Sequence, residues 1–297
     1  MQPELLIALV AGLGGMLGWG LADFFAKKTI DAVGDVVSLV WAHIFGTLIL
    51  GIVALYHYGV AGNELRVPDL TEWTWLAFFG VLQAAVYLYV YAGFAKGQVA
   101  VLSPIFASFS GLVALASVLF LGEVLGSTLL IVLVLIFIGV MLSSIDVHVA
   151  IRGSLIMAPG VREVGLATIL ATLWTLLWDR FIGGADWILF TLCMYAFMTV
   201  AMYAIAKKRG IALAIAPAQR HAWKFLVLIG ACEIVAYLAI SYGYSATTLT
   251  SVVAVLSGAF SLPVIILARI FLAERPTMTQ TVGSCIVILG VILLPLT

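Results

Sequence analysis

The sequence predicts an all-α integral membrane protein in which ten transmembrane helices form two inverted repeats of five helices each. Three observations support this fold class: an apolar composition, ten apolar stretches of spanning length, and an internal repeat. Hydrophobic residues make up 64% of the 297 residues and charged residues 9%, whereas soluble domains contain roughly 45–50% apolar and about 25% charged residues. So few charges cannot cover a surface that faces water, which excludes both a soluble enzyme and a disordered chain.

The apolar residues form ten stretches, each close to the roughly 20 residues that a helix needs to cross a bilayer. The stretches are Leu5–Ala26, Val36–Tyr56, Trp75–Phe94, Val99–Leu121, Thr128–Ile145, Val164–Phe181, Trp187–Ala206, Ala222–Tyr242, Leu249–Leu272 and Thr279–Leu296. They are apolar on all sides and lack the alternating pattern of a membrane β-strand. No basic residues precede the first stretch, so we expect a retained helix rather than a cleaved signal peptide.

An internal repeat becomes visible when the chain is shifted by 150 positions, with one extra residue in the later part. The aligned pairs are Trp73 with Trp223, Gly80 with Gly230, Gln83 with Glu233, Tyr87 with Tyr237, and Glu123 with Glu274. Because each repeat has an odd number of helices, the two repeats must cross the membrane in opposite orientations. Inverted repeats are typical of secondary transporters, which bind substrate between the halves near the middle of the membrane.

The repeat also predicts how the chain divides into domains. We expect the first five-helix repeat at residues 1–147, a connecting loop at residues 148–162, and the second five-helix repeat at residues 163–297. None of the loops is long enough to fold as a separate domain.

Three short patterns occur in a fixed order along the chain. The first is Leu17-Gly18-Trp19-Gly20 followed by Lys27, the second is the Leu-Gly-Glu or Leu-Ala-Glu sequence ending at Glu123 and Glu274, and the third is an Ile-Gly-Val or Leu-Gly-Val sequence near the end of each half. Together they resemble the drug/metabolite transporter superfamily, specifically its EamA-type ten-helix members, over essentially the whole chain. The resemblance implies a transporter of small solutes. Such proteins often carry an arginine in the second helix, where this chain has His43, so no role of that arginine is carried over.

Glu233 is the acidic residue at the middle of a predicted span. An ionisable group at the bilayer centre costs about 2.5–3.5 kcal/mol on insertion scales, and it therefore marks a candidate functional site. Its repeat mate is Gln83, the polar residue at the middle of the third span. Two polar side chains at equivalent depth in opposed repeats are what a central binding site requires.

Hydroxyl-bearing side chains follow Glu233 and Gln83 on the same face of each helix. At four-residue spacing, Glu233 is followed by Tyr237 and Ser241, and Gln83 is followed by Tyr87 and Tyr91. A cavity lined by a carboxylate, an amide and tyrosine rings suits a ligand with a cationic or polar head and an apolar or aromatic body. The alternative is that Glu233 is protonated and serves as a hydrogen-bonded packing contact between helices.

Three further residues deep in the spans are candidates for the same site. His43 could pair with Glu233 or line the pathway, since imidazole titrates near neutral pH, or it could be a neutral histidine bonded to a backbone carbonyl. Trp19 and Trp174 lie far enough from the span ends to face a substrate.

Two groups of charges near span ends are candidate gates. Asp23 and Lys27 are four residues apart near the end of the first span, and Asp179 and Arg180 hold a similar place in the sixth. They could close the mouth of the cavity. The favoured alternative is a pair of ion pairs at the headgroups, which contribute little when exposed.

Known catalytic and cofactor motifs do not occur in the sequence. It contains no nucleotide-binding loop, zinc-ligand spacing or paired catalytic carboxylates, so we expect no enzyme, cofactor or metal site. Balanced charges, with 14 basic and 14 acidic residues, give no reason to expect nucleic acid as a partner.

The sequence therefore predicts a secondary transporter of a small metabolite or drug-like solute, with export favoured. In a proton-coupled version Glu233 exchanges a proton for substrate. The alternatives are a facilitator or exchanger and, less favoured, a membrane-embedded enzyme or scaffold.

The sequence gives conflicting evidence on orientation. Arg66 and Arg180 lie on the side of both termini, and the other twelve basic residues lie on the opposite side. Because basic residues favour cytoplasmic loops, this pattern places both termini outside the cytoplasm. The family resemblance implies both termini inside, so only their location on one side is predicted. The membrane expected is the plasma, or inner, membrane.

Overall fold

The structure is a computed structural model that describes residues 3–94, 96, 99–144, 159–271 and 276–297. Within these residues, nine helices are long and apolar enough to cross a membrane, and Ile105–Phe120 is a shorter apolar helix. The predicted all-α, multi-pass membrane architecture is therefore confirmed. The predicted domain boundaries stay a prediction, since most of the connecting loop at residues 148–162 lies outside the described residues.

The helices follow the ten predicted stretches. The first half contains α1 (Pro3–Val33), α2 (Asp35–Leu55), a π-helical turn (Tyr56–Val60), α3 (Leu70–Phe94), α4 (Val99–Ala107), α5 (Phe109–Phe120) and α6 (Ser127–Ser144). The second half contains α8 (Val161–Ile182), α9 (Trp187–Lys208), α10 (Ala222–Ala246), α11 (Thr250–Ser257), α12 (Ser261–Phe271) and α13 (Met278–Leu293), with short 3-10 turns at Pro217–Gln219, Gly258–Phe260 and Leu294–Leu296.

Two of the predicted helices are broken, and the breaks lie at equivalent positions of the repeat. α4 and α5 are separated at Ser108, and α11 and α12 are separated by the 3-10 turn that begins at Gly258, which is 150 positions later. Pro263 explains the second break in part, because it has no N–H to bond the carbonyl of Ala259. Ala259 accordingly has a non-helical ψ of 19°. Broken helices of this kind are what transporters use to build binding sites and hinges.

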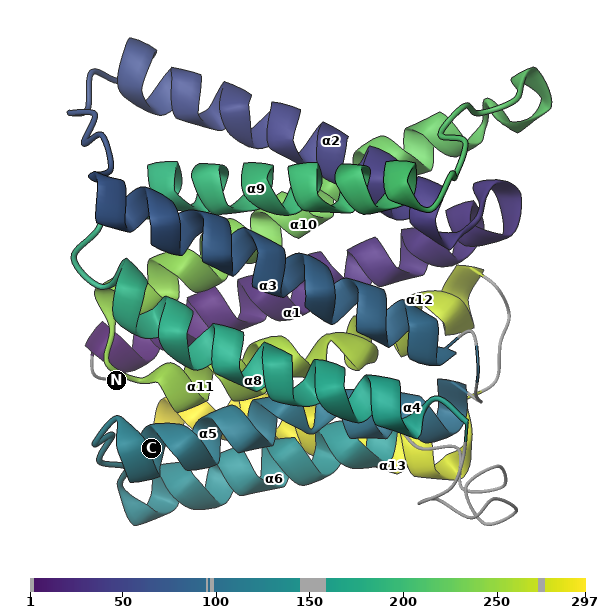
Figure 1. Cartoon of the computed structure of the whole chain (residues 1–297). Coiled ribbons are helices and arrows are strands. Elements are labelled where there is room, and N and C mark those ends of the chain that lie inside the picture. The colour runs from purple at the N-terminus through teal and green to yellow at the C-terminus, as the bar shows by residue number, and fades with distance from the viewer. Residues whose placement is uncertain (1–2, 95, 97–98, 145–158, 272–275) are drawn as a thin grey trace.

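The two halves of the chain are interleaved rather than separate. α1 packs against α10, α11 and α12, all of which belong to the second half, and α3 packs against α8 and α9. α6 and α13 lie side by side at one edge of the bundle (Figure 1). Most of the core therefore consists of contacts between the halves.

Glycine makes the closest of these contacts possible on α1. A methyl group at Gly18 would lie 2.6 Å from the carbonyl oxygen of Cys232 and 2.7 Å from the nitrogen of Ala236, so the two backbones touch here. This contact sets Glu233 level with Trp19. Asp23 then lies about one turn further along α1, because α1 and α10 run in opposite directions.

The bundle has two ends that differ in charge. We call the end that carries both termini, at the left of Figure 1, the terminal face. Its loops are residues 61–69, 121–126, 183–186 and 247–249. We call the opposite end the basic face, because exposed basic residues lie there: Lys96, Lys207, Lys208 and Arg209.

Candidate functional site

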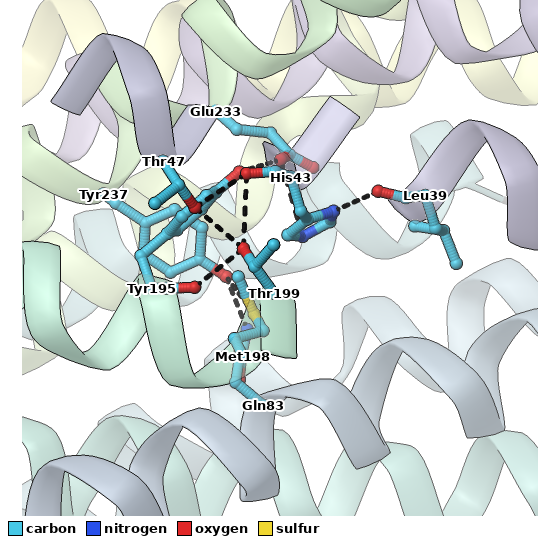
Figure 2. Close-up of polar contacts among 9 residues, drawn as sticks. All are labelled: Leu39, His43, Thr47, Gln83, Tyr195, Met198, Thr199, Glu233 and Tyr237. Atoms are coloured by element: carbon cyan, nitrogen blue, oxygen red, sulfur yellow. Dashed lines mark hydrogen bonds and ion pairs between the residues drawn. The ribbon is translucent and has the colours of Figure 1, made fainter. Parts of the chain in front are cut away.

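A buried carboxylate lies at the centre of the bundle. Glu233 is the twelfth of the 25 residues of α10, and only 4% of its surface is exposed. The hydroxyl of Tyr195, on α9, donates a hydrogen bond of 2.6 Å to Glu233 Oε2. The Nε2 atom of His43, on α2, lies 3.6 Å from the same oxygen (Figure 2). Two helices, α2 and α9, thus bring polar groups to the carboxylate of α10 at mid-depth.

The surroundings of His43 show where one of its protons lies. Its Nδ1 atom is 2.7 Å from the carbonyl oxygen of Leu39, and a carbonyl can only accept, so Nδ1 carries a hydrogen. In a neutral ring, Nε2 would then point a lone pair at the Glu233 carboxylate. Two acceptors facing each other away from water repel, so this approach is favourable only when a proton lies between the two groups.

Aromatic rings surround the next polar contact, one helical turn along α10. Gln83 Nε2, on α3, donates to the hydroxyl of Tyr237 at 2.9 Å. The edges and faces of Trp19, Trp174 and Tyr195 meet the Tyr237 ring, with centroid separations of 5.8, 6.1 and 5.3 Å. Tyr237 is completely buried.

Several buried polar atoms in this region have no partner within the described part of the chain. They are the Gln83 Oε1 atom and the indole nitrogens of Trp19 and Trp174. Buried polar groups are normally paired, and an unpaired one costs about 1–3 kcal/mol. These atoms are therefore available to a solute or to water when the region opens.

The two side-chain stripes predicted from the sequence meet in the structure. Gln83 and Tyr237 bond directly, and the ring of Tyr87 meets His43 edge-on at 5.3 Å. Ser241, one turn beyond Tyr237, accepts the indole N–H of Trp178 at 3.1 Å, while Tyr91 is half-buried.

Sequence reasoning missed Tyr195, which makes the shortest contact with Glu233. Its repeat mate is Phe45, so the repeat gave no signal of a polar pair at this depth. Next to it, the hydroxyls of Thr47 and Thr199 lie 2.9 Å apart, and both are within hydrogen-bonding distance of the His43 carbonyl, at 2.8 and 3.2 Å. One hydroxyl can donate to the other while the second donates to that carbonyl, which joins α2 to α9.

The structure places Asp23 nearer the centre of its helix than the sequence did. α1 continues to Val33 instead of ending at Ala26, because the polar residues after Ala26 form further helical turns. Asp23 is exposed although its neighbours Ala22 and Phe24 are 4% and 5% exposed. The side chain of its predicted partner Lys27 lies outside the described residues, so that ion pair stays a prediction.

The interpretation of Asp179 and Arg180 as an ion pair is wrong. Adjacent residues on a helix do not face each other, and these two have different partners. Asp179 accepts a hydrogen bond of 2.8 Å from the hydroxyl of Thr250, at the start of α11. Arg180 donates to the carbonyl of Leu121 at 2.7 Å.

Glu123, in the loop after α5, contacts the start of α11. Its carboxylate accepts two hydrogen bonds from Ser251, one from the backbone N–H at 3.0 Å and one from the hydroxyl at 2.5 Å. On the same face, Glu4 accepts from Thr248 at 3.0 Å, but both residues are exposed. The acidic residues Glu4, Glu123 and Asp179 line one cavity of about 720 Å³ at the terminal face. Glu274, the repeat mate of Glu123, lies outside the described residues.

Metal binding has no structural support in the described ranges. No group of three His, Cys, Asp or Glu side chains there could hold an ion. Cys193, Cys232 and Cys285 are all unpaired.

Comparisons with known proteins agree with this architecture. The model of the EamA-like transporter family matches residues 6–145 and 164–296. A solved structure described as "Crystal structure of protein" is 16% identical, with a TM-score of 0.75 over 97% of both chains, which shows similarity of fold alone. A comparison with curated proteins found no match.

Proposed function

The chain belongs to the EamA-like transporter family, and we propose that it is a secondary transporter that moves a small solute by alternating access around Glu233. The family is one of transporters and not of enzymes, as the sequence predicted. The observation that carries the proposal is the Glu233 carboxylate, buried at mid-membrane and bonded to Tyr195. Such a group is costly in a bilayer, and its presence therefore marks a functional site.

Proton coupling follows from the proton on the His43–Glu233 pair. When a cationic solute binds Glu233, its charge replaces that of the proton, and the proton leaves. When the solute leaves, the pair takes up a proton again, because an unpaired buried carboxylate is costly. Solute and proton therefore compete for one site, and this competition couples their movements in opposite directions.

The residues around Glu233 favour a solute with a cationic or polar head and an aromatic body. Trp19, Trp174 and Tyr237 present ring faces and edges, on which an aromatic body can stack and a cation can bind. Gln83 offers an unpaired carbonyl oxygen to an N–H donor of the solute.

Export is the direction we propose. Asp23 is exposed about one turn from Glu233 toward the basic face, and an exposed carboxylate within a span requires contact with water. At the terminal face, in contrast, Ser251 and Thr250 donate hydrogen bonds to Glu123 and Asp179, and these bonds fix the start of α11. If the basic face is cytoplasmic, as its charge favours, this conformation loads solute from the cytoplasm of a cell whose plasma membrane holds the protein. A reporter fused after Thr297 tests that orientation.

The experiment uses proteoliposomes that contain a pH-sensitive dye. Adding an aromatic monoamine, such as tryptamine, should produce a proton flux through the native protein. Glu233→Gln and Glu233→Ala should abolish the flux, and the control Glu163→Gln, which alters an exposed ion pair with Lys96, should not. Undiminished flux in both Glu233 variants would remove Glu233 from the mechanism. Solute uptake without any proton flux would favour the facilitator instead.

A further inference from the structure

The start of α11 is held by acidic residues from two other elements. Glu123, in the loop after α5, accepts from the N–H and the hydroxyl of Ser251. Asp179, in the last turn of α8, accepts from the hydroxyl of Thr250. Thr250 and Ser251 are 4% and 0% exposed, so the donors of these contacts are buried, whereas Glu123 is half-buried. Carboxylates also favour the partial positive charge of a helix N-terminus.

The hydroxyl contacts of this arrangement have no counterpart in the sequence of the other repeat. With a shift of 150 or 151 positions, Thr250 and Ser251 fall on two of the residues Val99, Ala100 and Val101, none of which has a hydroxyl. Glu274 takes the place of Glu123 there. The two inverted repeats are thus chemically unequal at the point where each broken helix begins.

The contacts lie between the central site and the cavity at the terminal face. Asp179 follows Trp178, which bonds Ser241 on the stripe that begins at Glu233. On the other side, Asp179, Glu123 and Thr250 line the cavity of about 720 Å³. The stripe from Glu233 to Ser241 on α10 is thus linked through Trp178 and Asp179 to the start of α11.

We propose that Glu123 and Asp179, by holding Ser251 and Thr250, form a gate that keeps the central site closed toward the terminal face. To open it, α11 must move away from α8 and the α5–α6 loop. The 3-10 turn at Gly258–Phe260 offers the hinge, since it already interrupts the helical hydrogen bonds. The inference rests on the proposed alternating-access function, but its test does not depend on any substrate.

Other charged groups lie near the gate but bond to residues outside α11. Arg180 lines the same cavity but donates to the Leu121 carbonyl, so it steadies the loop that carries Glu123. Glu4 and Tyr244 also line the cavity. The exposed contact of Glu4 with Thr248 lies outside α11 and supplies a matched control of the same chemistry.

The test measures how fast a buried thiol is labelled. In a variant whose three native cysteines are replaced, Ala254→Cys places a thiol on α11 one turn below Ser251, at a position that is 0% exposed. A second reporter, Leu50→Cys, is equally buried but lies on α2 away from the gate. Protein in nanodiscs is treated with a membrane-impermeant maleimide.

Opening the gate should expose the first thiol and leave the second protected. Thr250→Val, which loses one hydrogen bond to a charged group, should raise the labelling rate of Ala254→Cys by about tenfold, and Glu123→Ala, which loses two, should raise it at least as much. Glu4→Ala should leave the rate unchanged. An unchanged rate in both gate variants would overturn the proposal. Faster labelling of Leu50→Cys in the same variants would also overturn it, because the residues would then only stabilise the fold.

Discussion

The contact between Tyr195 and Glu233 gives a quantitative prediction about the charge of the site. A hydrogen bond to a charged group contributes about 1.5–3 kcal/mol and a neutral one about 0.5–1.5 kcal/mol. In membrane proteins, double-mutant cycles of polar pairs average only about 0.6 kcal/mol and reach about 1.7 kcal/mol. The Tyr195 hydroxyl lies 2.6 Å from Glu233 Oε2, which is typical of a charge-assisted bond. We therefore expect a coupling energy near the upper end of the membrane range, about 1.5–1.7 kcal/mol.

The assay is a double-mutant cycle on the free energy of unfolding in mixed micelles. Tyr195→Phe removes the hydroxyl, and Glu233→Met removes the acceptor while keeping much of the side-chain volume. The matched control is the neutral pair of Thr47 and Thr199, whose hydroxyls lie 2.9 Å apart. Replacing each with valine should give a coupling of about 0.6 kcal/mol.

The comparison of the two cycles decides the question. A larger coupling for Tyr195 and Glu233 than for the threonine pair supports a carboxylate that carries charge, with the extra proton on His43. Equal coupling for the two pairs would refute this reasoning, because it would mean that Glu233 is a neutral, hydrogen-bonded packing residue.

Two further predictions concern packing and pH. Gly18→Ala should lower the free energy of unfolding by about 1–3 kcal/mol. Gly51→Ala should raise it by about 0.5–1 kcal/mol, because a methyl group there would meet no atom within 4 Å. Equal effects of the two variants in thermal or chemical unfolding would contradict the backbone contact of α1 with α10. Burial raises the pKa of Glu123, and hydrogen bonds from α11 offset this only in part, so the closed gate binds a proton more tightly than an open gate with Glu123 in water. Only the thiolate reacts with maleimide, so labelling is compared with that of an exposed thiol at the same pH. Relative to that reference, Ala254→Cys should be labelled more slowly as the pH falls, and Glu123→Gln should reduce this extra dependence. Relative labelling that accelerates on acidification would reverse the assigned sign.

The helices could be predicted because membrane spans leave a strong compositional signal. The repeat also identified Glu233 and Gln83, since a carboxylate and an amide are rare at mid-span. What the sequence does not reveal is which helix faces which. Tyr195 could not be selected because tyrosine is common in membrane helices and its mate Phe45 has no hydroxyl.

Contacts between distant loops were equally hidden. Glu123 and Ser251 are 128 residues apart, and neither position alone indicates a partner. Asp179 next to Arg180 suggested an ion pair by adjacency, whereas the helix directs the two side chains to different neighbours. The length of α1 was underestimated because charges after Ala26 resemble the end of a span, although helices can extend beyond the hydrocarbon region.

The glycine face of α1 has a consequence for how the chain is made. Gly18 and Cys232 are 214 residues apart in the sequence, so at synthesis rates of about 5–20 residues per second α1 enters the bilayer roughly 10–40 s before its main partner exists. During that interval its small-residue surface must rest against lipid or a temporary neighbour. The bundle therefore cannot be completed before α10 is inserted. A ribosome that stalls before that helix leaves α1 without its main packing partner.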